Sequence, residues 1–493
     1  MRRFLVGVAA AAVVAAGAVA GPAVPAGAAT PTVAYKGANT AAVQDDFNGD
    51  GYRDLAVGAP SAADGSVESA GAVVVLYGSA SGTSGSRRTV VTQASEGVPG
   101  EPEAWDGFGA ATASADLDGD GYADLIVGTP DEGVGDAVGR GTVNVIWGGP
   151  NGLSGGGTLS APSGYGAGRT SCRFGESLAV GDLNGDGAPD VAVGSQCEGV
   201  VYTGPFTRTG RSAAVRDGIS GESRGAVIGD VDGDGTSELF WLPGLEDGNG
   251  RGPVYTDDGT GTLSGVTRLP LAHGLTGQIG DVNGDGYGDL VTGSYDDDAG
   301  DPSAAHVGGE IEVLYGGPDG ISSSRTPQVL SQDTADVPGA GERGDGFGYA
   351  LSVGDTDGDG FADVLVGAPD EAIGTVAEAG MVTLLRGSAA GLTGTGSAAW
   401  EQNTADVPGV AEEGDTFGAA VHLADLTGDG RAEVVVGVPG EDTAGCVWTA
   451  RGAAAGPSAV GSTTISGPTA GVTSLDASQP GFGSSFTSPH FGG

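Results

Sequence analysis

The stretch Asp46-Phe47-Asn48-Gly49-Asp50-Gly51 decides how this chain is organised, because its pattern occurs six more times. The later copies begin at Asp116, Asp182, Asp230, Asp281, Asp355 and Asp425, so successive starts lie 70, 66, 48, 51, 74 and 70 residues apart. Spacings of this size indicate a repeat architecture in which each unit can form one small sheet. The sequence therefore predicts an array of seven similar units.

A short aliphatic run follows most copies, as expected for a strand that is buried on both faces. The runs are Leu55-Ala56-Val57, Leu125-Ile126-Val127, Val191-Ala192-Val193, Leu290-Val291, Val364-Leu365-Val366 and Val434-Val435-Val436. Phe-Gly precedes four copies, at Phe108, Phe174, Phe347 and Phe417, and Gly-x-Pro follows four runs, at Gly58, Gly128, Gly367 and Gly437. The 99 glycines and 25 prolines also favour short strands separated by turns.

These motifs, in this order, resemble the FG-GAP repeats of integrin α-subunit head domains over about residues 40 to 491. The resemblance implies an all-β fold, a seven-bladed β-propeller with calcium bound on hairpin loops at one rim. Two middle units depart from the pattern, because Glu222-Ser223 and His273-Gly274 stand where Phe-Gly is expected.

The two ends of the repeat region complement each other. The first unit has Ala38-Asn39 at the Phe-Gly position, whereas Phe482-Gly483 near the C-terminus has no aspartate loop after it. We therefore expect a C-terminal strand near residues 482–486 to complete the first blade and close the ring. A truncated eighth blade is the alternative.

The aspartate loops have the spacing of a site for a hard cation, which takes several oxygen ligands from one tight loop. The predicted ligands at positions 1, 3, 5 and 9 are Asp46, Asn48, Asp50 and Asp54; Asp116, Asp118, Asp120 and Asp124; Asp182, Asn184, Asp186 and Asp190; Asp230, Asp232, Asp234 and Glu238; Asp281, Asn283, Asp285 and Asp289; Asp355, Asp357, Asp359 and Asp363; and Asp425, Thr427, Asp429 and Glu433. Position 12 is never acidic, which excludes an EF-hand.

The all-oxygen ligand set favours calcium over zinc, with magnesium as a weaker competitor. We expect up to seven Ca²⁺ ions with a mainly structural role, because closely spaced carboxylates repel one another until an ion neutralises them. The loop with Thr427 should bind calcium most weakly.

Residues 1–28 have the features of a secretory signal peptide: Arg2 and Arg3, an apolar run, and Ala26-Gly27-Ala28 as a cleavage site. Residues 29–39 form a short linker and residues 40–491 the propeller. The general export route is favoured over the twin-arginine route, because Phe4 directly follows Arg3. No later stretch is apolar enough to span a membrane, so we expect secretion, with release or loose association with the cell wall.

Two cysteines flank the loop that begins at Asp182. Cys172 lies two residues before Phe174, and Cys197 lies three residues after Gly194. The two should face each other in a hairpin that closes on this loop, which predicts a Cys172–Cys197 disulfide.

The sequence contains no local catalytic motif. Its four histidines are scattered, and Gly152-Leu153-Ser154-Gly155-Gly156 lies in a blade connector rather than at a strand-to-helix turn. The net charge of −44 argues against binding nucleic acid. We expect a monomeric, non-catalytic extracellular binding or adhesion module whose partner is a protein or a glycan. The alternatives are a polysaccharide lyase or hydrolase and a structural protein of the cell envelope.

Overall fold

The structure is a computed structural model that describes residues 43–135, 139–169, 171–244, 252–257, 265–295, 306–442, 444–473 and 481–487. These residues belong to the unit Val33–Gly493. The predicted signal peptide (1–28), the predicted linker (29–39) and the two ends of the predicted propeller (40–491) lie outside the described residues.

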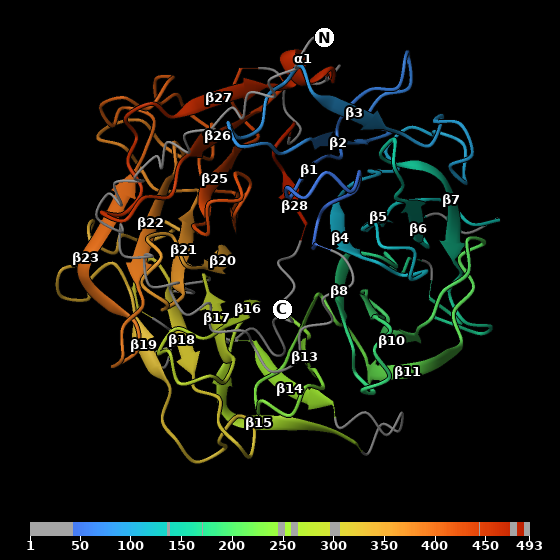
Figure 1. The fold of residues 1–493 in the computed structure, drawn as a ribbon, viewed down its shortest axis with the longest axis horizontal. Helices are drawn as coiled ribbons and strands as arrows, with labels where there is room; N and C mark the ends of the chain where they lie inside the picture. The colour runs from blue at the N-terminus through green and yellow to red at the C-terminus, as the bar shows by residue number, and fades with distance from the viewer. Residues whose placement is uncertain are drawn as a thin grey trace, which may run out of the picture. The chain divides into compact units, whose positions relative to one another are not determined.

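The described residues form seven four-stranded antiparallel sheets, arranged as the blades of a β-propeller (Figure 1). From the centre outward, they are blade 1, β28 (Ser485–Phe486), β1 (Leu55–Ala59), β2 (Ala72–Leu76) and β3 (Arg88–Val91); blade 2, β4 (Ala111–Ala115), β5 (Asp124–Thr129), β6 (Thr142–Trp147) and β7 (Ser154–Leu159); blade 3, β8 (Ser177–Gly181), β9 (Asp190–Gly194), β10 (Glu198–Thr203) and β11 (Ala214–Ser220); blade 4, β12 (Gly225–Gly229), β13 (Glu238–Leu242), β14 (Pro253–Asp257) and β15 (Val266–His273); blade 5, β16 (Thr276–Gly280), β17 (Asp289–Ser294), β18 (Glu310–Leu314) and β19 (Gln328–Leu330); blade 6, β20 (Ala350–Gly354), β21 (Asp363–Ala368), β22 (Met381–Arg386) and β23 (Thr393–Trp400); and blade 7, β24 (Ala420–Ala424), β25 (Glu433–Val438), β26 (Cys446–Ala450) and β27 (Thr463–Ser466). The prediction of an all-β, seven-bladed propeller is confirmed.

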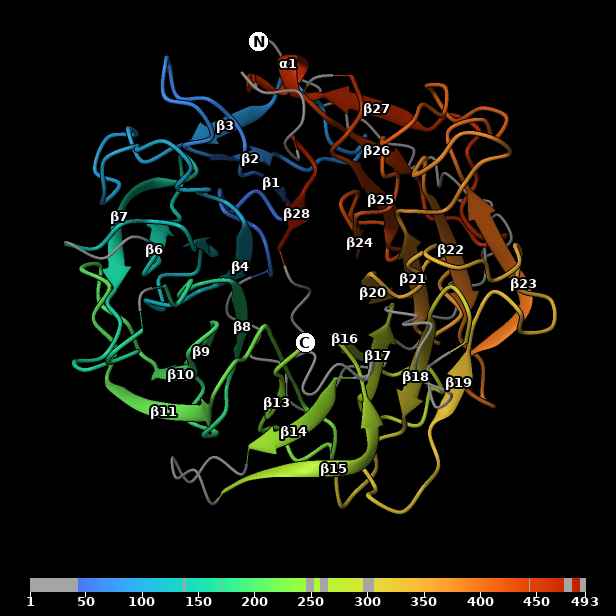
Figure 2. The same cartoon turned by 180° about the vertical axis from the view of Figure 1, so that it is seen from behind.

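The innermost strands of the blades surround the centre of the ring, and each contacts the innermost strand of the next blade (Figures 1 and 2). Beside the strands, the described residues contain one short helix, α1 (Gly467–Ala470). Within this part of the chain, no helix is both long and apolar enough to cross a membrane.

The second strand of each blade is apolar on both faces because it separates two cores. In β5, Leu125 and Val127 pack in the core between blades 1 and 2, whereas Ile126 packs in the core between blades 2 and 3. Alternate side chains of a strand point to opposite faces, so one aliphatic run supplies both cores. This explains the uninterrupted runs in the sequence.

The Phe-Gly and Gly-x-Pro motifs meet where neighbouring blades come closest. Phe108 is fully buried, and the N–H of Gly109 donates to the carbonyl of Gly128 in the same blade at 3.1 Å. A Cβ atom on Gly128 would collide with the carbonyl oxygen of Gly175 in blade 3. Only glycine therefore lets the two backbones approach this closely.

The two ends of the propeller share blade 1. Strand β28 pairs antiparallel with β1, with Val57 opposite Phe486 and Gly58 opposite Ser485. The N–H of Gly483 donates to the carbonyl of Gly58 at 3.1 Å, as the Phe-Gly glycines at 109, 175, 348 and 418 donate to the glycines at 128, 194, 367 and 437. The predicted closure of the ring by a C-terminal strand is confirmed.

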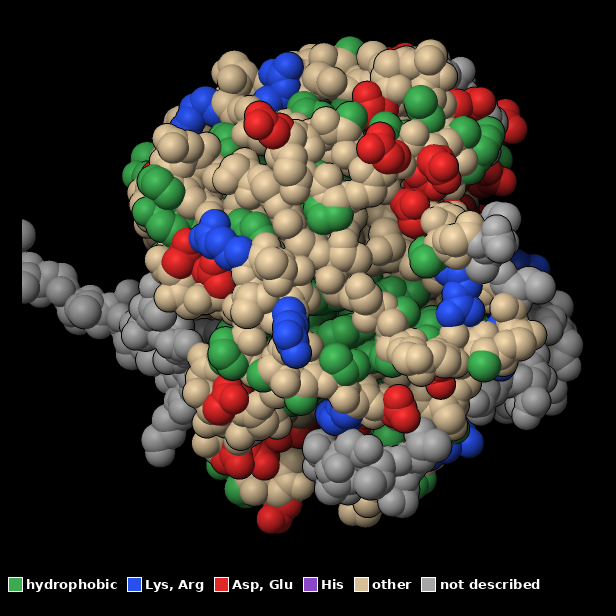
Figure 3. Space-filling view, turned by 90° about the vertical axis from the view of Figure 1, so that its right-hand side faces the viewer, with side chains coloured by type: hydrophobic (Ala, Val, Ile, Leu, Met, Phe, Trp, Pro, Cys, Tyr) green, Lys and Arg blue, Asp and Glu red, His purple; other side chains and the backbone are tan. Residues whose placement is uncertain are grey.

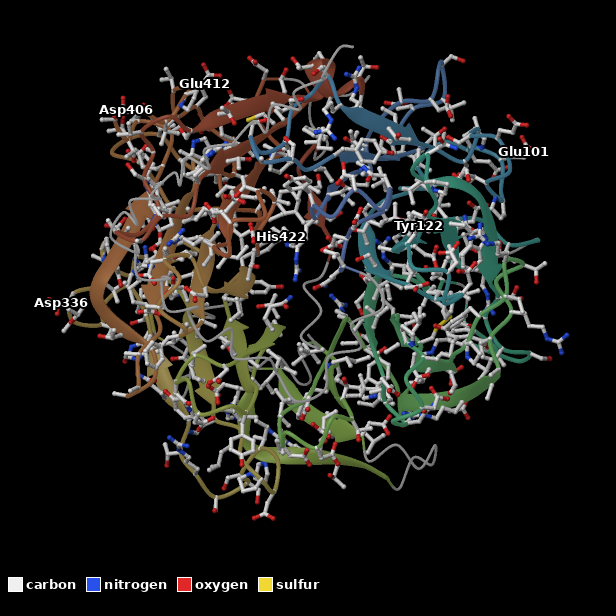
Figure 4. The ribbon with its side chains drawn as sticks, in the orientation of Figure 1. Glu101, Tyr122, Asp336, Asp406, Glu412 and His422 are labelled. Carbon is white, nitrogen blue, oxygen red and sulfur yellow. A yellow bond between two sulfur atoms is a disulfide. The ribbon has the colours of Figure 1, made fainter. Side chains whose placement is uncertain are left out.

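A buried histidine lies at this closure, near the centre of the ring (Figure 4). His422 in β24 is 1% exposed, its ring lies 6.1 Å from that of Phe486 in β28, and neither ring nitrogen has a hydrogen-bond partner. Burial, with a smaller contribution from the positive charge of Arg53, lowers the pKa of His422 to about 3. The folded protein therefore holds this imidazole neutral.

We expect His422 to make the closed ring sensitive to acid. An unfolded histidine has a pKa of about 6.5, so the stabilising effect of the neutral imidazole is complete above about pH 6.5 and is lost as the pH falls toward 3. At about pH 5 the loss amounts to ~2 kcal/mol of unfolding free energy. Denaturant unfolding at neutral pH and at about pH 5 should show a smaller acid-dependent loss for His422→Leu than for the unmodified chain. His306→Gln, at a site that is 53% exposed, is the control, and parallel losses in all three proteins would contradict this role.

Candidate metal centres

Each aspartate loop directly precedes the second strand of its blade, so the seven loops share one end of the propeller. In blades 2 to 7 the loop joins the first strand to the second, whereas in blade 1 it leads into β1 and the first strand, β28, comes from near the C-terminus. In blade 2, for example, the loop starts at Asp116, directly after β4, and its ninth residue, Asp124, begins β5. The 28 predicted ligands are thus placed at equivalent points before the second strands of the seven blades. On the side shown in Figure 3, acidic side chains gather in groups, some of them next to a basic side chain.

The first carboxylate of each loop shapes the backbone of the turn. Asp46 accepts hydrogen bonds from the N–H groups of Gly49 (2.7 Å), Asp50 (3.1 Å) and Gly51 (2.8 Å). The bond from position 6 recurs in the other six loops, to Asp116, Asp182, Asp230, Asp281, Asp355 and Asp425. The turn is therefore wound around its own first side chain.

The ninth carboxylate ties the loop to two other parts of its blade. In the first loop, Asp54 accepts from the N–H of Phe47 at 3.0 Å and from that of Gly78, after the third strand, at 2.9 Å. The hydrogen bond from the N–H at position 2 to the carboxylate at position 9 occurs in all seven loops. The bond from the glycine after the third strand occurs in the five loops that have aspartate at position 9.

Burial raises the pKa of these ninth carboxyl groups, and neighbouring carboxylates of the same loop add to the rise. The pKa is raised to about 8 for Asp54, to about 7 for Asp124, Glu238, Asp289 and Glu433, and to about 6 for Asp190. A dication in the loop would have the opposite effect, because it favours the charged form of each carboxyl group.

Three loops bring three carboxylates together, with one oxygen of each within 4.8 Å of the others: Asp116, Asp118 and Asp124; Asp230, Asp232 and Asp234; and Asp355, Asp357 and Asp359. These are the loops with aspartate at position 3. The other four loops carry Asn48, Asn184, Asn283 or Thr427 there.

The residues of these loops fit a calcium ion. Asp118 provides the clearest sign, since its Oδ1 is buried and has no hydrogen-bond partner. A buried acceptor of this kind is costly unless a cation or a donor reaches it. The convergent atoms are all hard oxygens, as calcium prefers.

Arginine side chains from other strands and connectors pair with carboxylates of three loops, which the sequence analysis missed: Arg87 with Asp50, Arg208 with Asp118 and Asp120, and Arg386 with Asp357 and Asp363. Arg386, at the end of β22, lies 2.7 Å from Asp363 and 3.1 Å from Asp357, and its side chain is 16% exposed. Arg208 lies 2.6 Å from Asp118 but is 50% exposed. The guanidinium of Arg386 is permanently charged, so it neutralises part of the negative charge of the blade 6 loop.

The two cysteines beside the blade 3 loop form the predicted disulfide. The bond joins Cys172, before β8, to Cys197, after β9. It lies at the end of the blade away from the aspartate loop. Cys446 in β26 is free and buried.

A cavity of about 310 Å³ opens at the other end of the central channel. It is lined by the first residues of the innermost strands, whereas the aspartate loops follow the last residues of the same strands. Polar side chains at this mouth include Glu176, Arg224, Gln278 and Tyr349. Tyr349 is 42% exposed, and its ring lies 4.9 Å from that of Tyr295.

Comparison with protein families finds the FG-GAP repeat at residues 38–76, 108–157, 174–212, 347–385 and 417–460. An FG-GAP-like repeat matches residues 230–292. Together the matches cover more than half of the chain, and they include the divergent middle blades.

Similar proteins include phosphatidylinositol-glycan-specific phospholipase D from Bos taurus, which is 34% identical over 154 residues, or 30% of this chain and 17% of that protein. Integrin alpha-IIb from Mus musculus is 32% identical over 197 residues, or 40% of this chain and 15% of the integrin. Integrin alpha-4 from Xenopus laevis is 31% identical over 147 residues, or 27% of this chain and 14% of the integrin. The matched region spans less than a fifth of each relative.

We expect Arg386 to weaken calcium binding in the blade 6 loop, because its guanidinium repels a dication among the same carboxylates. Arg386→Met should raise calcium affinity at this loop about tenfold, or ~1.4 kcal/mol. Calcium titration by calorimetry should show one more tight site than in the unmodified protein. Arg451→Met, which removes an exposed arginine, is the matched control, and identical isotherms for the three proteins would refute this effect.

Proposed function

Because the chain belongs to the FG-GAP repeat family, we propose that it is a calcium-stabilised extracellular binding module that does not catalyse a reaction. The observation that carries the proposal is the set of seven equivalent hairpin loops with oxygen side chains at the same four positions. The integrin relatives support extracellular binding in general.

The proposed role of calcium is to fasten each blade. In blades 2 to 7 a loop joins the first strand to the second, and in the five loops with aspartate at position 9 that side chain also accepts a hydrogen bond from the backbone after the third strand. In blades 2, 3, 5 and 6, an ion bound by positions 1, 3, 5 and 9 would therefore connect three strands of one blade. Its binding free energy would stabilise the folded state, because an unfolded chain does not preserve the loop.

An extracellular location is supported by several features. The N-terminal 28 residues have the pattern of a signal peptide. The Cys172–Cys197 disulfide is typical of an oxidising compartment. We propose a secreted monomer that is released or loosely associated with the cell wall, and whose partner is a protein or a glycan rather than nucleic acid.

We place the proposed partner site at the channel mouth opposite the aspartate loops. The cavity there combines apolar walls with a few polar groups and the exposed Tyr349, as ligand sites commonly do. The aspartate loops would then hold the scaffold, while the opposite face contacts the partner.

An enzyme is the second candidate, because several relatives are named phosphatidylinositol-glycan-specific phospholipase D. The match covers 17% of the bovine protein, so it supports the shared repeats more directly than a shared activity. A polysaccharide-active enzyme with residues contributed by several blades belongs to the same class of hypothesis.

Removal of calcium should lower the thermal unfolding midpoint, since the ion binds the folded state. One loop at a calcium concentration 100 times its Kd would contribute about 2.7 kcal/mol. Scanning calorimetry with calcium, and with a calcium chelator in the presence of magnesium, measures this effect. Asp230→Asn should reduce the calcium-dependent shift, because it removes one negative charge from the loop. Equal midpoints with and without calcium would refute a structural role for the ion.

A glycan panel, assayed for both retention and product, separates binding from catalysis. We expect retention without product, and weaker retention for Tyr349→Ala and Arg224→Ala at the channel mouth. Arg451→Ala, at the end that carries the aspartate loops, should behave like the unmodified protein. Formation of product would reject the binding-only proposal, and equal retention by all variants would move the partner site away from the channel mouth.

A further inference from the structure

Three connectors between blades carry a second acidic pattern, separate from the aspartate loops. Each contains Gln, Val-Pro-Gly, Glu and Asp before Phe-Gly, followed by a Glu just after the second strand of the next blade. We call these connector clusters: Gln93, Glu103, Asp106 and Glu132; Gln332, Glu342, Asp345 and Glu371; and Gln402, Glu412, Asp415 and Glu441. In each of them the Gln and the last Glu lie 39 residues apart.

The clusters lie at the end of the blades opposite the aspartate loops, because their members precede the first strand or follow the second. Glu412 lies toward the outside of the ring, away from the central His422 (Figure 4). In blade 2, one carboxylate oxygen from each of Glu103, Asp106 and Glu132 lies within 4.8 Å of the others. Asp106 is 2% exposed.

The three copies share one geometry. In each cluster the Asp carboxylate accepts a hydrogen bond from the N–H of the Glu three residues earlier, at 2.7 Å for Asp106, 2.6 Å for Asp345 and 2.7 Å for Asp415. The backbone carbonyl of the same Asp accepts from the N–H before the last Glu, at 3.3, 3.2 and 3.1 Å in the three copies. The repeat therefore preserves the placement of the Asp carboxylate and of the backbone that leads to the last Glu.

A buried glutamine amide reaches into each cluster with its oxygen unpartnered. Gln93 is 3% exposed, its Nε2 donates to Glu132 at 2.6 Å, and its Oε1 is buried without a hydrogen-bond partner. Gln332 and Gln402, which are 2% and 3% exposed, make the equivalent bond and leave the equivalent oxygen unpartnered. Three such oxygens at equivalent positions mark a place for a ligand that accepts electron pairs.

The Val-Pro-Gly turn makes room for this amide. Gly100 has φ 105°, and a Cβ atom there would lie 2.8 Å from Nε2 of Gln93. The corresponding distances are 3.0 Å for Gly339 and 3.3 Å for Gly409. The amide can therefore turn about its Cγ–Cδ bond and exchange Oε1 for Nε2 within the same space.

Among the described residues, no arginine or lysine pairs with Glu103, Asp106 or Glu132 of the blade 2 cluster. Arg173 approaches the same strand end but pairs with Asp131 and Glu176. Burial, followed by the charges of Asp106 and Glu103, raises the pKa of Glu132 to about 7. Burial, followed by the charges of Asp345 and Glu342, likewise raises the pKa of Glu371 to about 7.

Blade 3 shows what this position does in the fold. Cys172 occupies the place of Asp106, two residues before the Phe-Gly phenylalanine. The N–H of Gln196 donates to the carbonyl of Cys172, as that of Asp131 donates to the carbonyl of Asp106, which aligns Cys197 with Glu132. The disulfide therefore joins the two segments that carry the acidic side chains in blades 2, 6 and 7.

We propose that each connector cluster binds a divalent cation, best matched by calcium, through its three carboxylates and the turned glutamine amide oxygen, as a non-covalent counterpart of the blade 3 disulfide. Calcium accepts carboxylate and amide oxygens in an adaptable geometry, and water completes its shell. The ion joins the connector from one blade to the second strand of the next. It thus acts between blades, whereas the aspartate loops act within one blade.

The number of calcium ions bound per chain tests this proposal. Glu132→Gln/Glu371→Gln/Glu441→Gln should bind three fewer ions than the unmodified protein when both are dialysed against calcium and analysed by atomic absorption. Glu101→Gln/Asp336→Asn/Glu413→Gln removes the same charge from exposed positions of the three connectors and should retain the full number. Equal numbers in both variants would overturn the proposal.

Terbium luminescence excited through tryptophan provides a second test, in which Trp105→Phe leaves every proposed ligand in place. Trp105, which is 48% exposed, adjoins Asp106, whereas Trp147 lies under Arg208, which contacts the blade 2 aspartate loop. Trp105→Phe and Glu132→Gln should each lower the terbium emission from the connector site. Trp147→Phe should lower the emission from the aspartate loop, and Glu132→Gln should leave that emission unchanged. Emission unchanged by Trp105→Phe would overturn the connector site, while emission unchanged by Trp147→Phe would count only against the aspartate loop.

Discussion

The pairing of β28 with β1 is the constraint on which the rest of the structure depends. Each blade has two apolar faces, and a sheet with both faces apolar is covered only when a neighbour packs on each side. An open array would leave one face of its first and last blades in water and two strand edges unpaired. Two residue pairs, Val57 with Phe486 and Gly58 with Ser485, join β1 to β28. This pairing covers the exposed faces and pairs the free strand edges at the same time.

Once the ring is closed, its acidic side chains become the main electrostatic problem. The chain carries 64 acidic against 20 basic residues, and many of the acids are gathered in the turns at both ends of the blades. Backbone N–H groups donate hydrogen bonds to many of these carboxylates, as at Asp46 and Asp54. The raised pKa of Asp54 and Glu132 shows that hydrogen bonds alone do not offset their burial.

Sequence periodicity predicted the blade count, the second strands, the closing strand and the disulfide, because each depends on local spacing that a repeat makes visible. Arg386 in the blade 6 loop was not predicted, since it reaches that loop from the third strand, 23 residues after Asp363. The connector clusters were also missed. Their signal, Gln followed 39 residues later by Glu, is present in the sequence, but its members meet only when a connector folds against the following blade.

The blades that lack connector clusters show that the contact between neighbouring blades is made in several ways. Blades 2, 6 and 7 have acidic residues at the positions of the blade 3 disulfide, and in all four blades a backbone hydrogen bond joins the connector to the segment after the second strand. Blade 4 has no Phe-Gly, and its second strand instead carries Phe240 and Trp241, both buried. The Trp241 ring fills the space above Gly199 and Gly218 of blade 3, where a Cβ atom would collide with it. In blade 4, apolar volume thus replaces the shared motif where the sequence departs from it, and the unit still forms a four-stranded blade.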